Sequence, residues 1–180
     1  MKKFSLLFLL VAISIMSCTK KKTTPIIYTN CQLSEYLKLF KKTESDNIWT
    51  AISLQGKGSY FGLYQVGDAV LKDLNYWPKI SLQKFKKNPK IFPILKQETV
   101  MRELLRLNQK RLADIIYQYD KKLHKGYFIT ESGILASAHL LGASNVRKWF
   151  IDKYYDPMDG NGTKLTTYLI KFTNYDLNCL

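Results

Sequence analysis

Carboxyl groups that could act as general acids or bases are few in this chain. Its 180 residues contain five glutamates: Glu35, Glu44, Glu98, Glu103 and Glu131. Glu35 and Glu98 fall in the first turns of predicted helices, where the helix dipole favours a carboxylate. Glu103 stands beside two arginines, which indicates a solvated ion pair. Glu44 and Glu131 remain as candidates for proton transfer, although Glu131 is also explained as a first-turn residue of a predicted helix.

Glu44 is followed by Ser45 just past the end of a predicted helix, and three further motifs come after this pair. They are Gly62–Gly67 (GLYQVG), Ser132–Leu140 (SGILASAHL) and Asp159–Thr163 (DGNGT). The first of them begins eighteen residues after Glu44, and the last precedes a predicted helix with Tyr168 and Phe172 four residues apart. Each motif alone is weak, so the information lies in their order and spacing.

In this order the motifs resemble those of the lysozyme-like lytic transglycosylases of bacterial cell walls. That family has a catalytic Glu-Ser pair at a helix end, then a Gly-Leu-Met-Gln-hydrophobic motif and an Ala-Tyr-Asn-x-Gly motif. The chain departs from this pattern at Tyr64, in place of Met, and within Ala138–Gly142, which matches only at its ends. A branch with Gly-x-Tyr-Gln, Ala-His-Leu and Asp-x-Asn-Gly-Thr motifs is more similar, and the resemblance covers roughly residues 34–176.

The resemblance implies a lysozyme-like fold and cleavage of the MurNAc-β-1,4-GlcNAc bond of peptidoglycan, with Glu44 as general acid and then base. The residues expected to contact the glycan strand are Ser45, Tyr60, Tyr64, Gln65, His139 and Asn161. Such an acid needs a carboxyl group whose pKa is raised by apolar neighbours. The aromatic residues expected to supply them are Trp49, Tyr60, Phe61 and Tyr64. No cofactor and no metal ion are expected, because no Cys/His cluster has ligand spacing.

Three alternatives remain open for this site. A lytic transglycosylase needs one carboxylic acid, because the muramoyl 6-hydroxyl itself attacks C1 and gives a 1,6-anhydro product. A hydrolytic muramidase needs a second carboxylate, for which Asp46 or Asp68 is available. The departures at Tyr64 and Leu140 leave room for a catalytically inactive lipoprotein that binds peptidoglycan on the same scaffold.

Residues 1–17 have the pattern of an export signal. Two lysines precede an apolar run that is too short for a membrane span, and Ser17 precedes Cys18. This ending resembles a bacterial lipoprotein signal, cleaved before a lipidated Cys18; a plain membrane anchor or a buried helix is the alternative. Residues 18–26 are then a lipidated tether and 27–180 one domain, anchored in the outer membrane facing the periplasm or at the cell surface.

The formal net charge is +14, from 28 Lys and Arg against 14 Asp and Glu. This charge favours anionic partners at long range, but export argues against nucleic acid and favours wall polymers and a membrane surface. An exported binder of nucleic acid or of another anionic polymer is the alternative that rests on charge alone. The protein is expected to be a monomer. Cys31 and Cys179 remain besides Cys18, and they form either a disulfide or two free thiols.

Apolar periodicity predicts a mainly α-helical, lysozyme-like domain of the α+β type with at most a small β-hairpin. Helices are expected over residues 33–42, 65–74, 97–119, 133–141, 144–155 and 163–172. The glycine-rich stretch 55–62 is expected to form a loop or hairpin, and residues 77–93 to be irregular. The length suits one domain, and a hydrophobic content of 46% excludes disorder.

Overall fold

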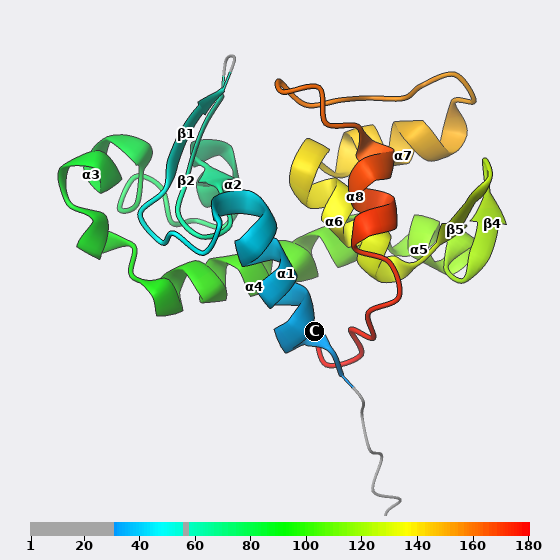
Figure 1. Ribbon diagram of the computed structural model, residues 1–180, viewed down its shortest axis with the longest axis horizontal. Helices are drawn as coiled ribbons and strands as arrows, with labels where there is room; N and C mark the ends of the chain where they lie inside the picture. The colour runs from blue at the N-terminus through cyan, green and yellow to red at the C-terminus, as the bar shows by residue number, and fades with distance from the viewer. Residues whose placement is uncertain (1–30, 56–57) are drawn as a thin grey trace, which may run out of the picture.

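The computed structural model describes residues 31–55 and 58–180. Within these ranges eight α-helices and one 3-10 helix accompany two small antiparallel sheets (Figure 1). The first elements are α1 (Leu33–Ser45), β1 (Ile52–Gln55), β2 (Gly58–Phe61), β3 (Val66–Gly67), α2 (Asp68–Asp73), α3 (Leu82–Lys87) and η1 (Pro89–Ile91). The later elements are α4 (Ile94–Arg111), α5 (Ala113–Tyr119), β4 (Lys122–His124), β5 (Tyr127–Ile129), α6 (Glu131–Leu141), α7 (Ala143–Ile151) and α8 (Leu165–Lys171). The predicted mainly α-helical class is confirmed.

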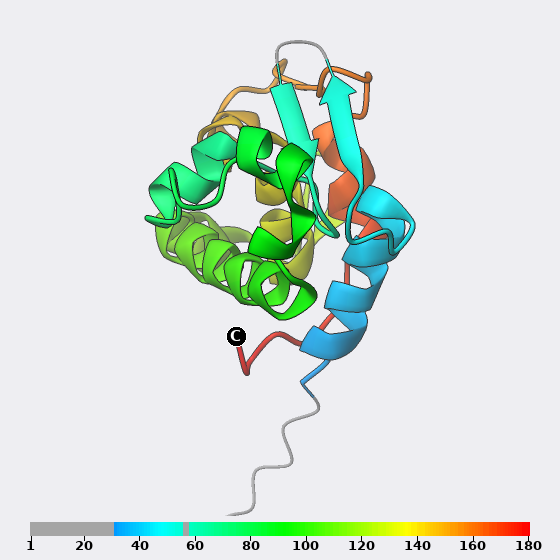
Figure 2. The same cartoon turned by 90° about the vertical axis from the view of Figure 1, so that its left-hand side faces the viewer.

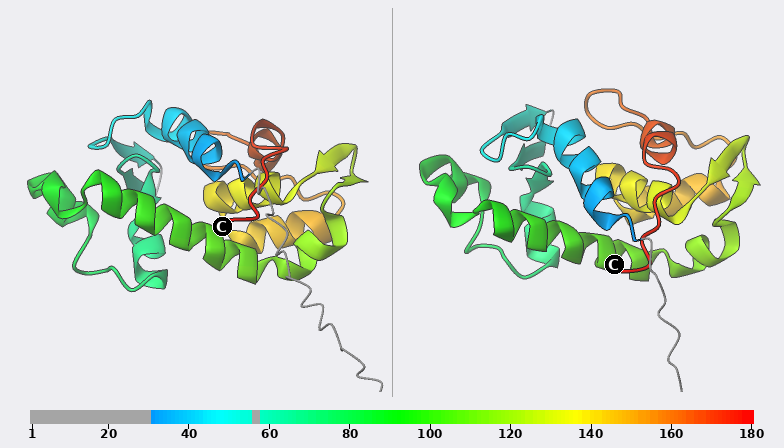
Figure 3. Two further views of the ribbon diagram at one scale, coloured as in Figure 1. Left: turned by 90° about the horizontal axis from the view of Figure 1, so that it is seen from below. Right: turned by 60° about the horizontal axis from the view of Figure 1, so that its bottom comes forward.

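The elements form two lobes joined by α4, as Figures 1 and 3 show. The sheet lobe consists of β1–β3, α2, α3 and η1, and the helical lobe consists of α5–α8 with the β4–β5 hairpin. Figure 2 views the molecule from the side of the sheet lobe, with α1 beside the hairpin of β1 and β2. One buried cluster extends from α1 over α4 into the sheet lobe, and a second lies among α5, α6, α7 and α8.

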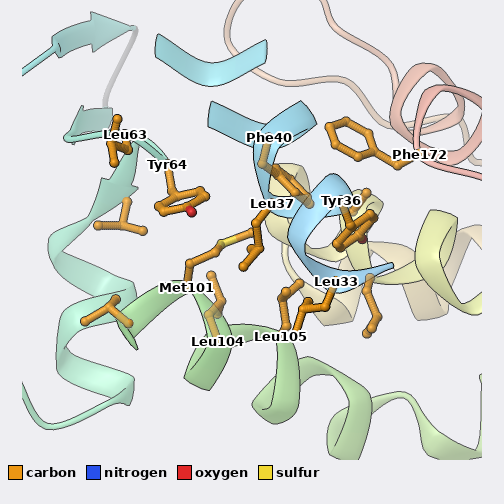
Figure 4. Close-up of a cluster of buried hydrophobic side chains, with 14 of the residues drawn as sticks. Leu33, Tyr36, Leu37, Phe40, Leu63, Tyr64, Met101, Leu104, Leu105 and Phe172 are labelled. Carbon is orange, nitrogen blue, oxygen red and sulfur yellow. The ribbon is translucent and has the colours of Figure 1, made fainter. Parts of the chain in front are cut away.

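α1 is held by an apolar stripe that packs over α4 (Figure 4). The buried residues of this stripe are Leu33, Tyr36, Leu37 and Phe40. Met101 and Leu105 of α4 belong to the same cluster, and the ring of Phe172 lies 4.2 Å from that of Phe40. Complete burial of such a side chain contributes about 1.5–3 kcal/mol, so the stripe fixes α1 between the two lobes.

α1 continues beyond Lys42, where the sequence predicted its end. It reaches Ser45, and Asp46 closes it in the left-handed conformation (φ 53°) with its N–H bonded to the carbonyl of Lys41. Lys42 also forms an ion pair with Asp46 across this last turn. Glu44 therefore belongs to the last turn of the helix rather than to the segment after it.

The apolar stripe over 97–119, predicted as one helix, forms α4 and α5. Leu112 separates them with non-helical angles (φ −114°, ψ 16°), while its side chain is fully buried. The break lets Leu112 and Ile115 join the cluster of the helical lobe. Neither Gly nor Pro stands at this position, and the apolar periodicity continues through it, so the sequence did not indicate a break between two helices.

The sheet lobe differs from its predicted form at two places. The helix expected to start at Gln65 starts at Asp68, because residues 62–65 form a turn and Val66–Gly67 pair with β2 as an antiparallel strand. The stretch 77–93, expected to be irregular, contains α3 and η1. Ser81 caps α3 with a side-chain oxygen that accepts from the N–H of Lys84 at 3.5 Å, which favours a helix start.

The helical lobe is built around α6, whose residues 132–138 are all buried. Thr130 caps this helix by accepting from the N–H of Gly133 at 3.2 Å, and the helix begins at Glu131, two residues before its predicted start. The helices expected over 144–155 and 163–172 form as the shorter α7 and α8. The β4–β5 hairpin is an additional element; with only three residues in each strand, it leaves little periodicity to detect.

The two ends of the described chain meet at the start of α1. Cys31 and Cys179 form a disulfide with their Cα atoms 5.8 Å apart, one of the two alternatives left by the sequence. The N–H of Gln32 donates to the carbonyl of Asp176 at 2.7 Å beside it. The predicted signal peptide 1–17, Cys18 and the tether lie outside the described residues. None of the described helices is long and apolar enough to cross a membrane.

Candidate functional site

A pocket of about 230 Å³ lies between the sheet lobe and helices α6 and α8. In Figure 1 these elements face each other across the upper part of the molecule. The lining residues are Thr43, Glu44, Ser53, Tyr60, Gln65, His139, Leu140, Asp159, Gly160, Asn161, Thr163 and Tyr168. They come from seven separate segments of the chain, so the pocket exists only in the folded domain.

Glu44 enters the pocket from the last turn of α1 and is nearly buried, with 12% of its side chain exposed. Tyr168 of α8 donates a hydrogen bond of 2.7 Å to Glu44 Oε1. His139 of α6 places Nε2 at 3.4 Å from the same oxygen. No hydrogen bond to Oε2 comes from the described residues, so Oε2 is the oxygen available to a ligand.

Tyr168 holds its proton firmly. Burial raises the pKa of its hydroxyl well above the usual value, and the neighbouring Glu44 carboxylate raises it further. The hydroxyl therefore remains a hydrogen-bond donor to Glu44. Tyr168 was not among the predicted site residues, although it lies in the helix that follows the Asp159–Thr163 motif.

His139 is one of the least exposed polar side chains of the pocket, with 5% of its side chain accessible. Its ring stands edge-on to Phe40, with 5.0 Å between ring centres. Nδ1 is buried without a hydrogen-bond partner among the described residues. The packing of Phe40 on one side and the carboxyl group of Glu44 on the other fixes the direction in which Nε2 points.

Gln65 reaches the pocket from the turn at residues 62–65 and has a left-handed backbone (φ 46°). Its side-chain Nε2 donates to the carbonyl of Gly62 at 2.8 Å, which closes the turn on itself. The side-chain Oε1 is buried and has no hydrogen-bond partner in the described chain. Gln65 thus lines the same pocket as Glu44.

Ser45 and Tyr64, both predicted to contact substrate, do not line the pocket. The Ser45 hydroxyl donates to the carbonyl of Leu63 at 2.9 Å, so it ties the end of α1 to the turn that carries Gln65. Tyr64 is 1% exposed and belongs to the core. Burial raises the pKa of its hydroxyl well above the usual range, and the nearby Glu98 adds to this effect.

Tyr60 and Asn161 both line the pocket, from β2 and from the loop before α8. Tyr60 pairs with Gly67 across the sheet, where a Cβ atom would lie 3.3 Å from the tyrosine ring, so glycine leaves room for this ring. Asn161 is held in a tight loop by Asp159, whose Oδ1 accepts from the N–H groups of Asn161 (2.9 Å) and Thr163 (2.7 Å). The Asp159–Thr163 motif therefore folds as a compact rim.

The expected aromatic environment of Glu44 is only partly present. Tyr60 lines the pocket, whereas Phe61 and Tyr64 are core residues, and Trp49 packs against that core. Glu44 is enclosed instead by Tyr168 and His139, which belong to helices far from it in sequence. The prediction that aromatic residues close to Glu44 in the sequence surround its carboxyl group was therefore wrong for all of them except Tyr60.

Gln97 supports the pocket from behind and was not predicted. Its Oε1 accepts from the N–H of Leu63 at 2.6 Å, and its Nε2 donates to the carbonyls of Trp49 (3.0 Å) and Phe92 (2.7 Å). It also lies so close to Gly62 that a Cβ there would be 2.5 Å from Gln97 Oε1. The sequence feature that could have indicated this role is a glutamine within the apolar stripe of α4.

The other acidic candidates lie outside the pocket. Glu131 accepts a hydrogen bond from Gln109 at 2.7 Å, as expected for a structural residue at the start of α6. Asp46 pairs with Lys42, and Asp68 accepts from the N–H of Leu82 at 3.0 Å. Asp159 is the second carboxylate of the pocket. Across residues 31–55 and 58–180, no three His, Cys, Asp or Glu side chains gather as metal ligands.

Comparisons with known proteins identify no relative of this chain. No protein-family model matches the chain, and searches of the curated proteins and of the solved structures find no match either.

Proposed function

We propose that the protein is a peptidoglycan lytic transglycosylase, exported and anchored as a lipoprotein through Cys18, and working as a monomer without a cofactor. The observation that supports this proposal is the pocket itself. It contains Glu44, Tyr60, Gln65 and His139 together with Asn161, five of the residues that the motif resemblance implies.

In the proposed mechanism a protonated Glu44 gives its proton to the oxygen of the MurNAc-β-1,4-GlcNAc bond as the bond to C1 breaks. The muramoyl 6-hydroxyl then attacks C1, and the Glu44 carboxylate accepts the proton of this hydroxyl. Both protein contacts of Glu44 fall on Oε1, so we assign the proton transfers to Oε2. One carboxyl group completes the cycle and returns to its starting state.

The surroundings of Glu44 fit this role in two ways. Its low exposure restricts water, which would otherwise compete with the 6-hydroxyl for C1. The rim offers the glycan strand an aromatic face at Tyr60 and polar side chains at Ser53, Asn161 and Thr163, a combination suited to a sugar ring with its apolar faces and hydroxyl edges.

A muramidase is the second candidate, and Asp159 favours it. Hydrolysis requires a second carboxylate as base or nucleophile, and Asp159 is the acidic residue that shares the pocket with Glu44. Its Oδ1 is already engaged by two backbone N–H groups, which leaves Oδ2 to act. Asp46 and Asp68, the candidates from the sequence, do not line the pocket.

Digestion of purified sacculi with the full-length protein tests the proposal. Mass spectrometry of the released muropeptides is expected to show 1,6-anhydro ends. Reducing ends instead of anhydro ends would replace the proposal with the muramidase. Binding to sacculi without release of either product would contradict both enzymes and indicate a wall-binding lipoprotein on the same scaffold.

A further inference from the structure

A large share of the net positive charge lies in one segment of the described chain. Residues 72–96 carry seven lysines and one aspartate, or +6 of the total formal charge of +14. The lysines are Lys72, Lys79, Lys84, Lys86, Lys87, Lys90 and Lys96. The single acid, Asp73, is paired with Arg111 at 2.9 Å, so it does not neutralise them.

Two of these lysines lie over aromatic rings, and exposed apolar side chains alternate with the lysines along the segment. Lys72 Nζ lies 4.7 Å from the ring centre of Trp77, which is 44% exposed. Lys96 Nζ lies 4.5 Å from the ring of Tyr76, and its neighbour Leu95 is 78% exposed. We call the exposed residues of the segment 72–96 the basic patch.

The basic patch occupies the sheet lobe, away from the pocket. α2, α3 and η1 carry most of it, and α3 lies at one end of the long axis of the molecule in Figure 1. None of its residues lines the pocket next to Glu44. The patch and the pocket can therefore be occupied at the same time.

We propose that the basic patch docks the domain on a bilayer with anionic head groups. Lysines are attracted to such a surface, and the attraction falls with salt. Exposed Trp and Leu side chains between lysines are typical of segments that enter the head-group region. A hydrated polyanion of the cell wall would use the lysines but would give Trp77 and Leu95 nothing apolar to contact, so we favour the bilayer.

Trp77 is a built-in probe of this contact. The chain has three tryptophans; Trp149 is 2% exposed and Trp49 packs against the core, whereas Trp77 is open to solvent. The full-length protein is bound to vesicles of phosphatidylglycerol and phosphatidylethanolamine with brominated acyl chains, which quench tryptophans that enter the bilayer. We expect quenching that disappears in Trp77→Phe, in high salt and on brominated phosphatidylcholine vesicles.

Two variants with reversed charges, one in the basic patch and one outside it, make the test specific to the patch. The patch variant replaces three lysines with glutamate (Lys86→Glu/Lys87→Glu/Lys90→Glu), and we expect it to lose the quenching of Trp77. The control variant makes the same change in charge on the helical lobe (Lys121→Glu/Lys122→Glu/Lys171→Glu), and we expect it to keep the quenching. If the first variant fails to fold by circular dichroism, the corresponding Lys→Gln variant replaces it.

Equal quenching on anionic and zwitterionic vesicles, equal loss in both charge variants, or no quenching of the wild type would each overturn the proposal. Absence of quenching together with patch-dependent binding to sacculi would assign the patch to a wall polymer instead. None of these results depends on whether the protein cleaves peptidoglycan.

Discussion

Glu44 receives both of its polar contacts on the same oxygen, and this asymmetry is the main chemical feature at the residue scale. Tyr168 donates to Oε1 at 2.7 Å and His139 approaches it at 3.4 Å. A carboxyl group held at one oxygen is oriented without losing the other oxygen for chemistry. Tyr168 and His139 are thus positioning residues for Glu44.

Tyr168→Phe should lower the rate of sacculus cleavage by about 10- to 100-fold, because a misplaced catalytic group loses rate steeply. Fold stability should fall by about 1–3 kcal/mol at most, the cost of leaving a buried hydrogen-bonding group without its partner. Rates of anhydro-muropeptide release and urea unfolding measure the two effects. Tyr155→Phe is the matched control, since its hydroxyl bonds Asn145 outside the pocket at 2.5 Å; full activity of Tyr168→Phe would contradict the positioning role.

The sequence predicted the position of a site residue correctly where the residue lies in a short turn formed by its own motif. Gln65 and Asn161 stand in short turns, so their motifs predicted their place in the pocket. Tyr64 stands beside Gln65 in the same motif and Ser45 stands beside Glu44, but the side chain of Tyr64 lies in the core and the Ser45 hydroxyl bonds a backbone carbonyl. Nothing in a single sequence indicates which way such a side chain turns, nor that Tyr168 contacts a residue 124 positions earlier in the chain.

At the scale of elements, the site depends on the contact between α6 and α8, which bring His139 and Tyr168 to Glu44. Gly133 allows this contact, since a Cβ at that position would lie 2.5 Å from the carbonyl oxygen of Leu169. The sequence predicted both helices from apolar periodicity. The close approach of α6 and α8 depends on the absence of a Cβ atom at Gly133, and apolar periodicity does not predict such a contact.

Gly133→Ala should destabilise the domain by about 1–3 kcal/mol, the usual cost of inserting a carbon atom into a packed contact. Urea unfolding measures the change. Gly160→Ala serves as the control, because a Cβ at this position meets nothing within 4 Å, and it should leave stability within about 0.5 kcal/mol. An equally small effect of Gly133→Ala would show that α6 and α8 can separate at little cost.

Gln97 links α4 to three backbone segments of the sheet lobe, and Gln97→Leu should reduce the free energy of unfolding by about 2–4 kcal/mol. The reason is that buried backbone groups of Leu63, Trp49 and Phe92 lose their partner. Gln118→Leu is the control on the exposed surface, with an expected change within about 0.5 kcal/mol. Equal stability of the two variants in chemical denaturation would exclude this supporting role.

At the scale of the whole molecule, a pocket lies between the two lobes, a disulfide joins the two ends of the described chain, and a large share of the positive charge lies on the sheet lobe. Composition predicted the total charge but not its concentration in residues 72–96, although the lysine run was visible. The predicted fold class holds because burial patterns average over many residues. The break at Leu112 and the short hairpin β4–β5 escaped prediction because each rests on a few residues.

The disulfide between Cys31 and Cys179 closes a loop of 148 residues, and chain entropy assigns such a long loop up to about 5 kcal/mol. Cys31→Ser/Cys179→Ser should therefore unfold about 2–5 kcal/mol more easily than the oxidised protein. Calorimetry of the variant, with the wild type under reducing conditions as control, measures this difference. Identical melting of the oxidised protein and the variant would rule out a stabilising bond.

The most direct test of the central claim compares Glu44→Gln with Glu131→Gln on purified sacculi. The two variants make the same change from carboxyl to amide, one in the pocket and one at the start of α6, where it accepts from Gln109. Release of 1,6-anhydro-muropeptides should fall by about 10²- to 10⁴-fold in Glu44→Gln, the usual contribution of a general acid, and stay near wild type in Glu131→Gln. Unchanged release by Glu44→Gln would contradict the assignment of Glu44 as the catalytic acid.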